Sequence, residues 1–393
     1  MTQHMPDPIP TLPPADLIHA LIRGDLPSLG RLHLARMHFP SGRAPNAAIS
    51  LDGQDWIAEW TGPEGAERAH AEADRLHRAG QVAELRFDPA SGLLLRRPGS
   101  DAKLPGLRLL ADPGLAADTL AGLGLAGPFR IDLVAHRLGR RAVLRIRHSK
   151  GLAYARLRSP TASAGRAAVA HHRSLWQALP AGAALRLPAP LGEDRALGLA
   201  LYAALPGHPL HLRGLRGFAG IEATARALSD LQQIATDAPL WTAEDEIALL
   251  GRWLDRIAAI FPELWPHLSA QFAAQKADFR KLPPMAPVTC HRDLHEGQIL
   301  HFRGRAGILD FDTLSRGDPA QDLGNLQAHL DLAGLRQGRS LAAYATAMER
   351  NFPHLPLSRI AVWRRAARLR LAMIWAFSAE PRAHLLALAG DVA

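Results

Sequence analysis

The chain has 393 residues, of which 48% are hydrophobic and 21% are charged, and its formal net charge is +9 at pH 7. This composition is typical of a globular protein and excludes a collagen-like or intrinsically disordered chain. The arginines are scattered among apolar residues instead of clustering with aromatic ones. We therefore expect no nucleic-acid partner, although a basic cleft for phosphates agrees with the charge.

The N-terminus has no basic region followed by an apolar core, and no run approaches the roughly 18 apolar residues that a membrane span needs. We expect a cytoplasmic protein without a membrane partner. The single cysteine, Cys290, excludes an internal disulfide and a cysteine-based zinc site. It follows an apolar run, which favours a buried small residue over a catalytic thiol.

The first part of the chain predicts short strands around one helix. Residues 1–15 are proline-rich and predict a loosely ordered arm. Residues 17–37 predict a helix that is broken near Gly24 and Pro27. After this, periodicity and turn residues predict strands at 48–51, 56–60, 82–87 and 93–97 and a helix at 65–78.

A similar order of elements returns further along. Residues 130–134, 142–146, 152–157, 185–187 and 197–202 predict strands, residues 165–179 a helix, and residues 192–194 a turn. The stretches 55–89 and 153–190 both predict strand, helix and strand, with Pro or Gly at matching places. This parallel suggests an internal duplication, although helices rich in Ala and Arg resemble one another by composition alone.

The last part of the chain is helical. Helices are predicted at 221–234, 243–260, 268–279, 322–330, 340–349 and 357–378, and a strand at 306–309. We predict three segments: an N-terminal α+β extension at 1–125, a β-rich lobe at 126–206, and a helical lobe at 207–393. The internal duplication would make the extension a degenerate repeat of the β-rich lobe. The expected fold class is α+β with two lobes.

Acidic residues gather in the stretch 288–326, each beside short apolar runs. Phosphoryl transfer needs a carboxylate to orient the attacking hydroxyl group and oxygen ligands for a metal on the nucleotide phosphates. Asp293 suits the first role. Asp310 and Gln298 suit the second, with Asp312 as a further ligand or a hydrogen-bonding partner. The spacing therefore predicts a phosphoryl-transfer site.

The sequence HRDLHEGQ, residues 291–298, resembles the catalytic loop of protein kinases. GILDFDTLSRGDPAQDLGNL, residues 307–326, resembles the aminoglycoside phosphotransferase and choline kinase family. LPGHPL at 205–210, RLGRRAVLRI at 137–146 and AYARLRSP at 153–160 are similar to other segments of that family. The resemblance covers about residues 126–340. It implies a bilobal protein-kinase-like fold, with a β-rich N-lobe and an α-helical C-lobe, that binds ATP and Mg²⁺.

By this resemblance, Asp293 matches the catalytic aspartate and Asp310 a metal-binding aspartate of the family. Gln298 lies where the family has a metal-binding asparagine. Asp318, in Gly-Asp-Pro, is expected to fix its loop, and Asp322 to begin a helix.

The phosphate-binding side departs from the family pattern. Arg156 lies where the family has a lysine that grips phosphates, and arginine keeps the charge but not the shape of lysine. Lys150 is a weaker candidate for this role, and Arg140 belongs to a basic turn that either faces phosphates or is merely solvated. Residues 165–179 contain no Glu or Asp to pair with the cation.

Two functions follow as hypotheses. The first is an ATP- and Mg²⁺-dependent kinase that acts on a hydroxyl group of a small molecule, such as an amino alcohol, a sugar or an aminoglycoside-like compound. The second is a catalytically degenerate kinase-like protein that binds nucleotide or a protein partner without turnover. The acidic residues favour the first, and the altered cationic residues favour the second.

Overall fold

The computed structural model describes residues 12–40, 44–62 and 64–390. The chain divides into two compact units. The N-terminal unit runs to Gly165 and also contains Leu191–Tyr202 and Phe377–Ala379; the C-terminal unit contains Arg166–Pro190, Ala203–Ala376 and the chain from Glu380.

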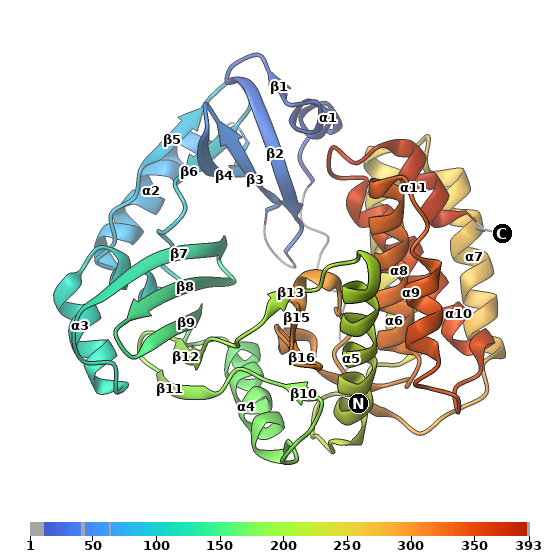
Figure 1. Ribbon diagram of the computed structural model, residues 1–393. Helices are drawn as coiled ribbons and strands as arrows, with labels where there is room; N and C mark the ends of the chain where they lie inside the picture. Colours follow the sequence, from blue (N-terminus) through green and yellow to red (C-terminus); the bar gives the residue numbers. More distant parts are fainter. Residues whose placement is uncertain (1–11, 41–43, 63, 391–393) are drawn as a thin grey trace, which may run out of the picture. The chain divides into compact units, whose positions relative to one another are not determined.

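The first sheet of the N-terminal unit has six strands in the order β1-β2-β3-β4-β6-β5 (Figure 1). Its elements are α1 (Ala15–Arg23), β1 (Asp25–Leu26), β2 (Gly30–His38), β3 (Asn46–Leu51), β4 (Gln54–Trp60), α2 (Gly65–Arg78), β5 (Leu85–Asp88) and β6 (Leu93–Arg96). We call β2 to β6 with α2 the first module.

The second sheet of this unit has five strands in the order β11-β12-β9-β8-β7. The second module consists of β7 (Phe129–Arg137), β8 (Arg141–His148), β9 (Gly151–Arg158), β11 (Pro190–Asp194) and β12 (Leu199–Ala203). The helix α4 (Ser163–Ala178), which follows β9 in the chain, belongs from Arg166 onward to the C-terminal unit. Read from the other edge, β7-β8-β9-β12-β11 repeats the order β2-β3-β4-β6-β5. The β2–β3 register shifts between Leu34 and Arg36, and the β7–β8 register shifts between Leu133 and Ala135, ninety-nine residues on in both cases.

One face of the second sheet is buried beneath residues that precede it in the chain. The covering elements are η1 (Pro105–Leu110) and α3 (Pro113–Gly122). Their leucines form one core with alternate residues of β8 and β9, because side chains in a strand point to opposite faces in turn. The central members of this core are Leu107, Leu120, Leu144, Ile146 and Leu157, none more than 1% exposed.

The C-terminal unit is mainly helical (Figure 1). Its helices are α5 (Gly214–Gln233), α6 (Ala243–Ile260), α7 (Trp265–Lys281), α8 (Gln321–Gln337), α9 (Ala342–Glu349), α10 (Leu357–Trp375) and α11 (Arg382–Ala389). Gly324 allows α8 to approach α10, since a Cβ atom there would lie 2.5 Å from the backbone nitrogen of Arg364.

Two small sheets carry the acidic stretch. The first has the order β10-β16-β15-β13 and the second pairs β14 with β17. Their strands are β10 (Leu185–Arg186), β13 (His208–Pro209), β14 (Val288–Cys290), β15 (Ile299–Phe302), β16 (Arg305–Ile308) and β17 (Ser315–Gly317). Acidic residues follow the ends of two of these strands: Asp310 comes after β16, and Asp318 comes after β17.

The predicted α+β class, with strands before helices, is confirmed. The predicted helix at 17–37 is wrong beyond Gly24, where β2 buries Leu32, Leu34 and Met37 on a strand. The predicted turn at 192–194 lies inside β11, and α3 was not predicted. The expected arm falls mostly on residues 1–11, which lie outside the described residues. None of the described helices combines the length and apolar character that crossing a membrane requires.

Candidate active site

The loop that follows β14 is fixed by one buried carboxylate. The backbone N–H groups of His291 and Arg292 each donate a 2.7 Å hydrogen bond to Asp322, one to each carboxylate oxygen. Asp322 lies in the first turn of α8 and is fully buried. Burial raises the pKa of Asp322, whereas the hydrogen bonds from the two N–H donors act against this rise.

Both ring nitrogens of His291 contact backbone groups. Its Nε2 lies 2.8 Å from the carbonyl oxygen of Leu309, and its Nδ1 accepts a 3.3 Å hydrogen bond from the N–H of Asp293. Thr313 donates to the carbonyl of His291. The imidazole thus ties the loop to the end of the β15–β16 hairpin.

Asp293 is exposed although its neighbours are held firmly. The next residue, Leu294, is fully buried, and its carbonyl accepts a 2.8 Å hydrogen bond from the side chain of Asn325 on α8. Asn325 is held in turn by Arg370, which also contacts Glu246. The backbone is therefore fixed on both sides of Asp293, while its carboxylate is open to a substrate.

The side-chain oxygen of Gln298 is buried and accepts no hydrogen bond from the described residues. Gln298 ends the short helix η2 (Glu296–Gln298), and its side chain is buried with 7% exposed. A buried acceptor without a donor costs about 1–3 kcal/mol, and the side-chain oxygens of Gln321 and Gln327 share this state.

The backbone places Gln298 beside Asp310. The N–H of Leu309 donates a 3.0 Å hydrogen bond to the carbonyl of Gln298, and β15 pairs with β16 in the register Ile299 to Ile308. Asp310 follows directly with φ +67°, a left-handed conformation that aspartate tolerates better than most residues. Asp312 lies in the next short helix, η3 (Phe311–Thr313).

These donors fit a magnesium ion. Mg²⁺ prefers oxygen ligands and keeps several waters, so two carboxylates and an amide oxygen are a suitable set. No cluster of three His, Cys, Asp or Glu side chains suited to a metal occurs within the part of the chain that the structure describes. Gln298, Asp310 and Asp312 as metal ligands therefore stay a prediction.

Two other residues of this region are structural. Asp318 accepts hydrogen bonds of 2.5 to 3.0 Å from Arg359 and a 2.9 Å bond from the N–H of Ala320, which agrees with its expected role in fixing the loop. Cys290 is fully buried. Burial raises the pKa of its thiol well above the ordinary value, and the charges of Asp322 and Asp318 raise it further. The buried position expected for Cys290 is confirmed.

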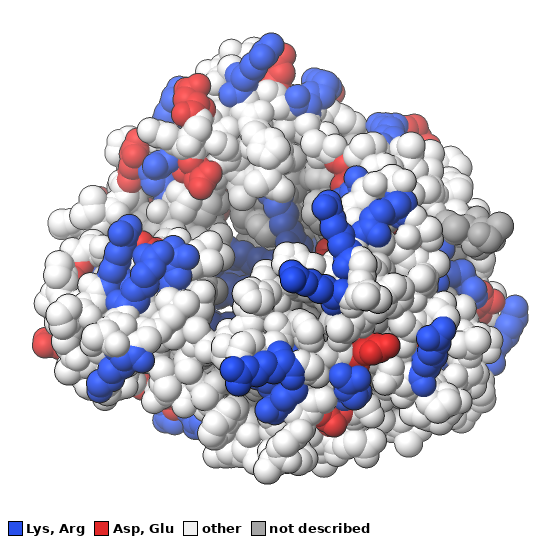
Figure 2. Space-filling view, in the orientation of Figure 1, with Lys and Arg blue, Asp and Glu red and all other residues white. Residues whose placement is uncertain are grey.

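The cationic candidates lie at two ends of the second module. Arg156 on β9 pairs with Val143, close to the β7–β8 turn that contains Arg140. Lys150 lies in the turn at the opposite end of the β8–β9 hairpin, where its ammonium group donates a 2.9 Å hydrogen bond to the carbonyl of Gly124. Figure 2 shows basic side chains gathered over β7 and β8. Arg156 and Arg140 thus share one end of the sheet, and Lys150 does not.

Sequence reasoning missed the residues that hold the loop. Asp322 was expected only to begin a helix, and Asn325 and Arg370 were not singled out. Both Asp322 and Asn325 reach back from α8 to the loop that contains Asp293. Their spacing of three residues on one helix face was the available signal.

Comparison with known proteins gives a consistent result. A family model described as "Phosphotransferase enzyme family" matches residues 132–356. No curated protein matches the chain in sequence.

Solved structures with a similar fold include a thermostable mutant of the aminoglycoside phosphotransferase APH(4)-Ia. Its sequence is 13% identical, the alignment covers 66% of this chain and 94% of that chain, and the TM-score is 0.51. The spectinomycin phosphotransferase APH(9)-Ia, solved with ADP and spectinomycin, has 8% identity, covers 70% and 92%, and has a TM-score of 0.51. These two similarities establish the fold. The macrolide 2'-phosphotransferase MphH from Brachybacterium faecium has 22% identity, covers 70% and 96%, and has a TM-score of 0.49.

Proposed function

Because the chain belongs to the phosphotransferase enzyme family, we propose that it transfers the γ-phosphoryl group of ATP to a hydroxyl group of a small molecule. The observation that carries this proposal is the buried, unpaired Oε1 of Gln298 beside Asp310. The use of ATP is supported by the ADP in the structure of the similar spectinomycin phosphotransferase.

In the proposed reaction, Asp293 orients the acceptor hydroxyl group and takes its proton as the hydroxyl oxygen bonds to the γ-phosphorus. The bond from that phosphorus to the β–γ bridging oxygen breaks, and ADP leaves with the electron pair. Such a base needs free access to substrate and a fixed backbone, and Asp293 has both.

Asp310, Asp312 and Gln298 would hold Mg²⁺, which when bound offsets the negative charge of the phosphates. Arg156 and Arg140 would bind phosphate oxygens from the second module, since guanidinium groups bind them through two hydrogen bonds at once. Lys150 is the weaker candidate because its ammonium group already donates to Gly124.

The acceptor is an amino alcohol, a sugar or an aminoglycoside-like compound in this proposal. The similar proteins named above are an aminoglycoside phosphotransferase and a spectinomycin phosphotransferase, and at 13% and 8% identity they do not select the acceptor of this chain. A screen of acceptors by ATP consumption with Mg²⁺ tests the proposal. Turnover that depends on Mg²⁺ and is lost in Asp310→Asn, but not in the exposed control Asp255→Asn on α6, is the expected result.

The second candidate is a degenerate protein that binds nucleotide without turnover. It is favoured by Gln298 and Arg156 in place of the family's Asn and Lys, and by the lack of acidic residues in α4. Nucleotide binding with Mg²⁺ but no ATP consumption over a broad panel would support this candidate. Failure to bind nucleotide at all would exclude the first candidate and would leave, of the second, only a degenerate protein that binds a protein partner.

A further inference from the structure

A cavity of about 370 Å³ lies within the first module, outside the residues that the family model matches apart from the β7–β8 turn. Residues of β3, β4, β6 and α2 line it, together with the segment after β6 and that turn. Its volume lies at the lower end of the range of about 300–1,000 Å³ that is usual for small-molecule sites. The cavity is therefore large enough for a compact ligand.

The floor of the cavity has two polar side chains without partners. Asn46 on β3 and Glu59 on β4 face each other across the strand pair, so their side chains lie on the same face of the sheet. Asn46 is only 6% exposed. Among the residues that the structure describes, no hydrogen bond or ion pair joins either side chain to another group. Burial raises the pKa of Glu59, and the charge of Arg96 acts against this rise.

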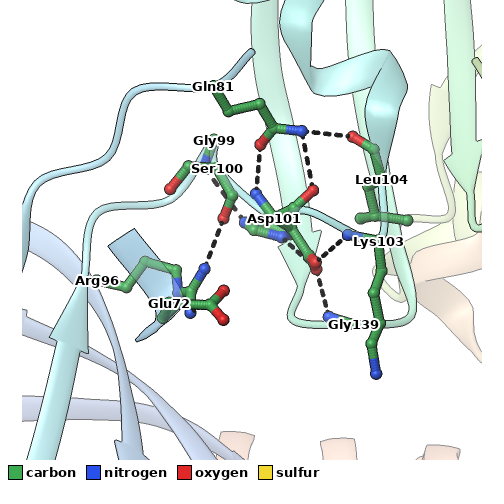
Figure 3. Close-up of polar contacts among 10 residues, drawn as sticks. Glu72, Gln81, Arg96, Gly99, Ser100, Asp101, Lys103, Leu104 and Gly139 are labelled. Atoms are coloured by element: carbon green, nitrogen blue, oxygen red, sulfur yellow. Dashed lines mark hydrogen bonds and ion pairs between the residues drawn. The ribbon is translucent and has the colours of Figure 1, made fainter. Parts of the chain in front are cut away.

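One wall of the cavity is a single face of α2. Arg68, Ala71, Glu72 and Arg75 have the spacing of neighbours on a helix surface. Glu72 is shared between two cations, with one oxygen 2.7 Å from Arg75 and the other 2.8 Å from Arg96. Arg96 also donates to the carbonyl of Ser100 (Figure 3). Both carboxylate oxygens of Glu72 are thus paired with arginines, while Arg68 adds an exposed cation at the rim.

The opposite wall is formed by the segment that contains Asp101 and Lys103 (Figure 3). The Asp101 carboxylate accepts hydrogen bonds from the N–H groups of Lys103 and Gly139 and lies 3.5 Å from Nε2 of His136. Both oxygens of the Asp101 carboxylate thus already accept hydrogen bonds from the protein. In Figure 3 the Lys103 side chain extends away from them, and no described residue accepts a hydrogen bond from its ammonium group.

We propose that this cavity binds a hydroxyl-rich small molecule that carries a phosphate group, in the class of sugar phosphates. Arg68, Arg75 and Lys103 supply cationic donors for the phosphate. Asn46 and Glu59 supply the donor and acceptors that hydroxyl groups need. No aromatic residue lines the cavity within the described part of the chain, so a purine base has no ring to stack on. This favours a sugar phosphate over a nucleotide.

The experiment is isothermal titration calorimetry of the full chain with glucose 6-phosphate, ribose 5-phosphate and glycerol 3-phosphate. Glucose, inorganic phosphate and AMP serve as comparison ligands. At least one sugar or polyol phosphate is expected to bind about tenfold more tightly than any of the comparison ligands, because both halves of the site are then engaged. No binding by any of the three phosphates overturns the proposal.

Variants locate the binding. Arg68→Ala should weaken it about tenfold, whereas Arg78→Ala, an exposed position on the same helix that does not line the cavity, should leave it unchanged. Glu59→Gln should also weaken binding of the sugar phosphate but not of inorganic phosphate, and its unfolding curve shows whether it still folds. Asp310→Asn should have no effect.

Three outcomes would contradict the assignment. Inorganic phosphate that binds as tightly as the sugar phosphates indicates an adventitious anion only. AMP that binds most tightly and depends on Arg68 assigns a nucleotide instead. Binding that is lost in Asp310→Asn but kept in Arg68→Ala places the ligand at the candidate active site.

Discussion

The backbone N–H of His291 donates a 2.7 Å hydrogen bond to Oδ2 of Asp322, which lies in the first turn of α8. The other oxygen of the same carboxylate accepts from Arg292. The position of the loop that contains Asp293 therefore depends on a fully buried acidic side chain elsewhere in the chain.

Replacement of Asp322 by asparagine should destabilise the protein. The introduced side-chain amide would turn its NH₂ group toward one of the two backbone N–H groups, which leaves a buried donor without an acceptor and costs about 2–3 kcal/mol. Chemical denaturation measures this change in the free energy of unfolding. Asp255→Asn, on the exposed surface of α6, should change it by less than about 0.5 kcal/mol. Equal effects of the two changes would show that Asp322 does not anchor the loop.

Replacement of Asp293 by asparagine should remove turnover without affecting folding. The side chain is exposed, so the unfolding midpoint should stay within the error of measurement. Loss of a general base typically lowers kcat by about 10²–10⁴-fold. ATP consumption with a confirmed acceptor measures kcat, and thermal shift with ATP and Mg²⁺ should still show nucleotide binding. An unchanged kcat would refute the role of Asp293.

Replacement of Gln298 by leucine separates stability from metal binding. Leucine removes the buried Oε1 that has no donor, so without Mg²⁺ the free energy of unfolding should stay equal or rise by up to about 1 kcal/mol. The extra stabilisation by ATP with Mg²⁺ should become smaller. Thermal unfolding with and without Mg²⁺ measures both effects. The control is Gln298→Asn, which introduces the residue of the family pattern and should keep the Mg²⁺ effect. If the leucine variant also kept the Mg²⁺ effect, Gln298 would be excluded as a metal ligand.

Cys290 should not react with thiol reagents in the folded protein. Its side chain is fully buried, and burial raises the pKa of the thiol well above the ordinary value, so little thiolate forms at neutral pH. Titration with a chromogenic disulfide should detect no thiol before unfolding and one thiol in denaturant. Cys290→Ala should retain turnover, and rapid labelling of the native protein would contradict its buried position.

His38 should make the N-terminal compact unit less stable in acid. Burial and the charges of Arg137, Arg36, Arg140 and Arg141 lower the pKa of His38 to about 3, from an unfolded value near 6.5. Between these two values the unfolded state binds a proton that the folded state does not, so stability falls as the pH drops from about 6.5 toward 3. Urea unfolding at several pH values measures the trend, and His38→Gln should reduce its slope. A slope that is the same in both proteins would refute this origin.

Much of the fold follows from local patterns in the sequence. The helix at Gly65–Arg78 and that at Ala243–Ile260 were predicted with the bounds that the structure has, because their periodicity and breakers are local. The strand Gly30–His38 was not predicted, since its buried Leu32, Leu34 and Met37 acquire a sheet face only when β3 pairs with it. Local periodicity cannot report such a distant partner.

In the candidate site, too, some features follow from the local sequence and others depend on distant contacts. Asp293, Gln298 and Asp310 were found from their order along the chain, and their roles stay predictions. The anchoring of the loop by Asp322 could not be predicted, because it depends on how α8 meets β14. The unpaired oxygen of Gln298 could not be predicted either, since it depends on the surroundings of a buried side chain.

The core beneath the second sheet has a practical consequence for anyone who would shorten this protein. The family match begins at residue 132, yet the leucines of η1 and α3 that cover β8 and β9 precede it. Asp101, which holds the β7–β8 turn at Gly139, precedes it as well. A fragment cut at the family boundary would expose an apolar sheet face to water and invite aggregation. A fragment meant to fold on its own should therefore begin before residue 132, where the match to the family model starts.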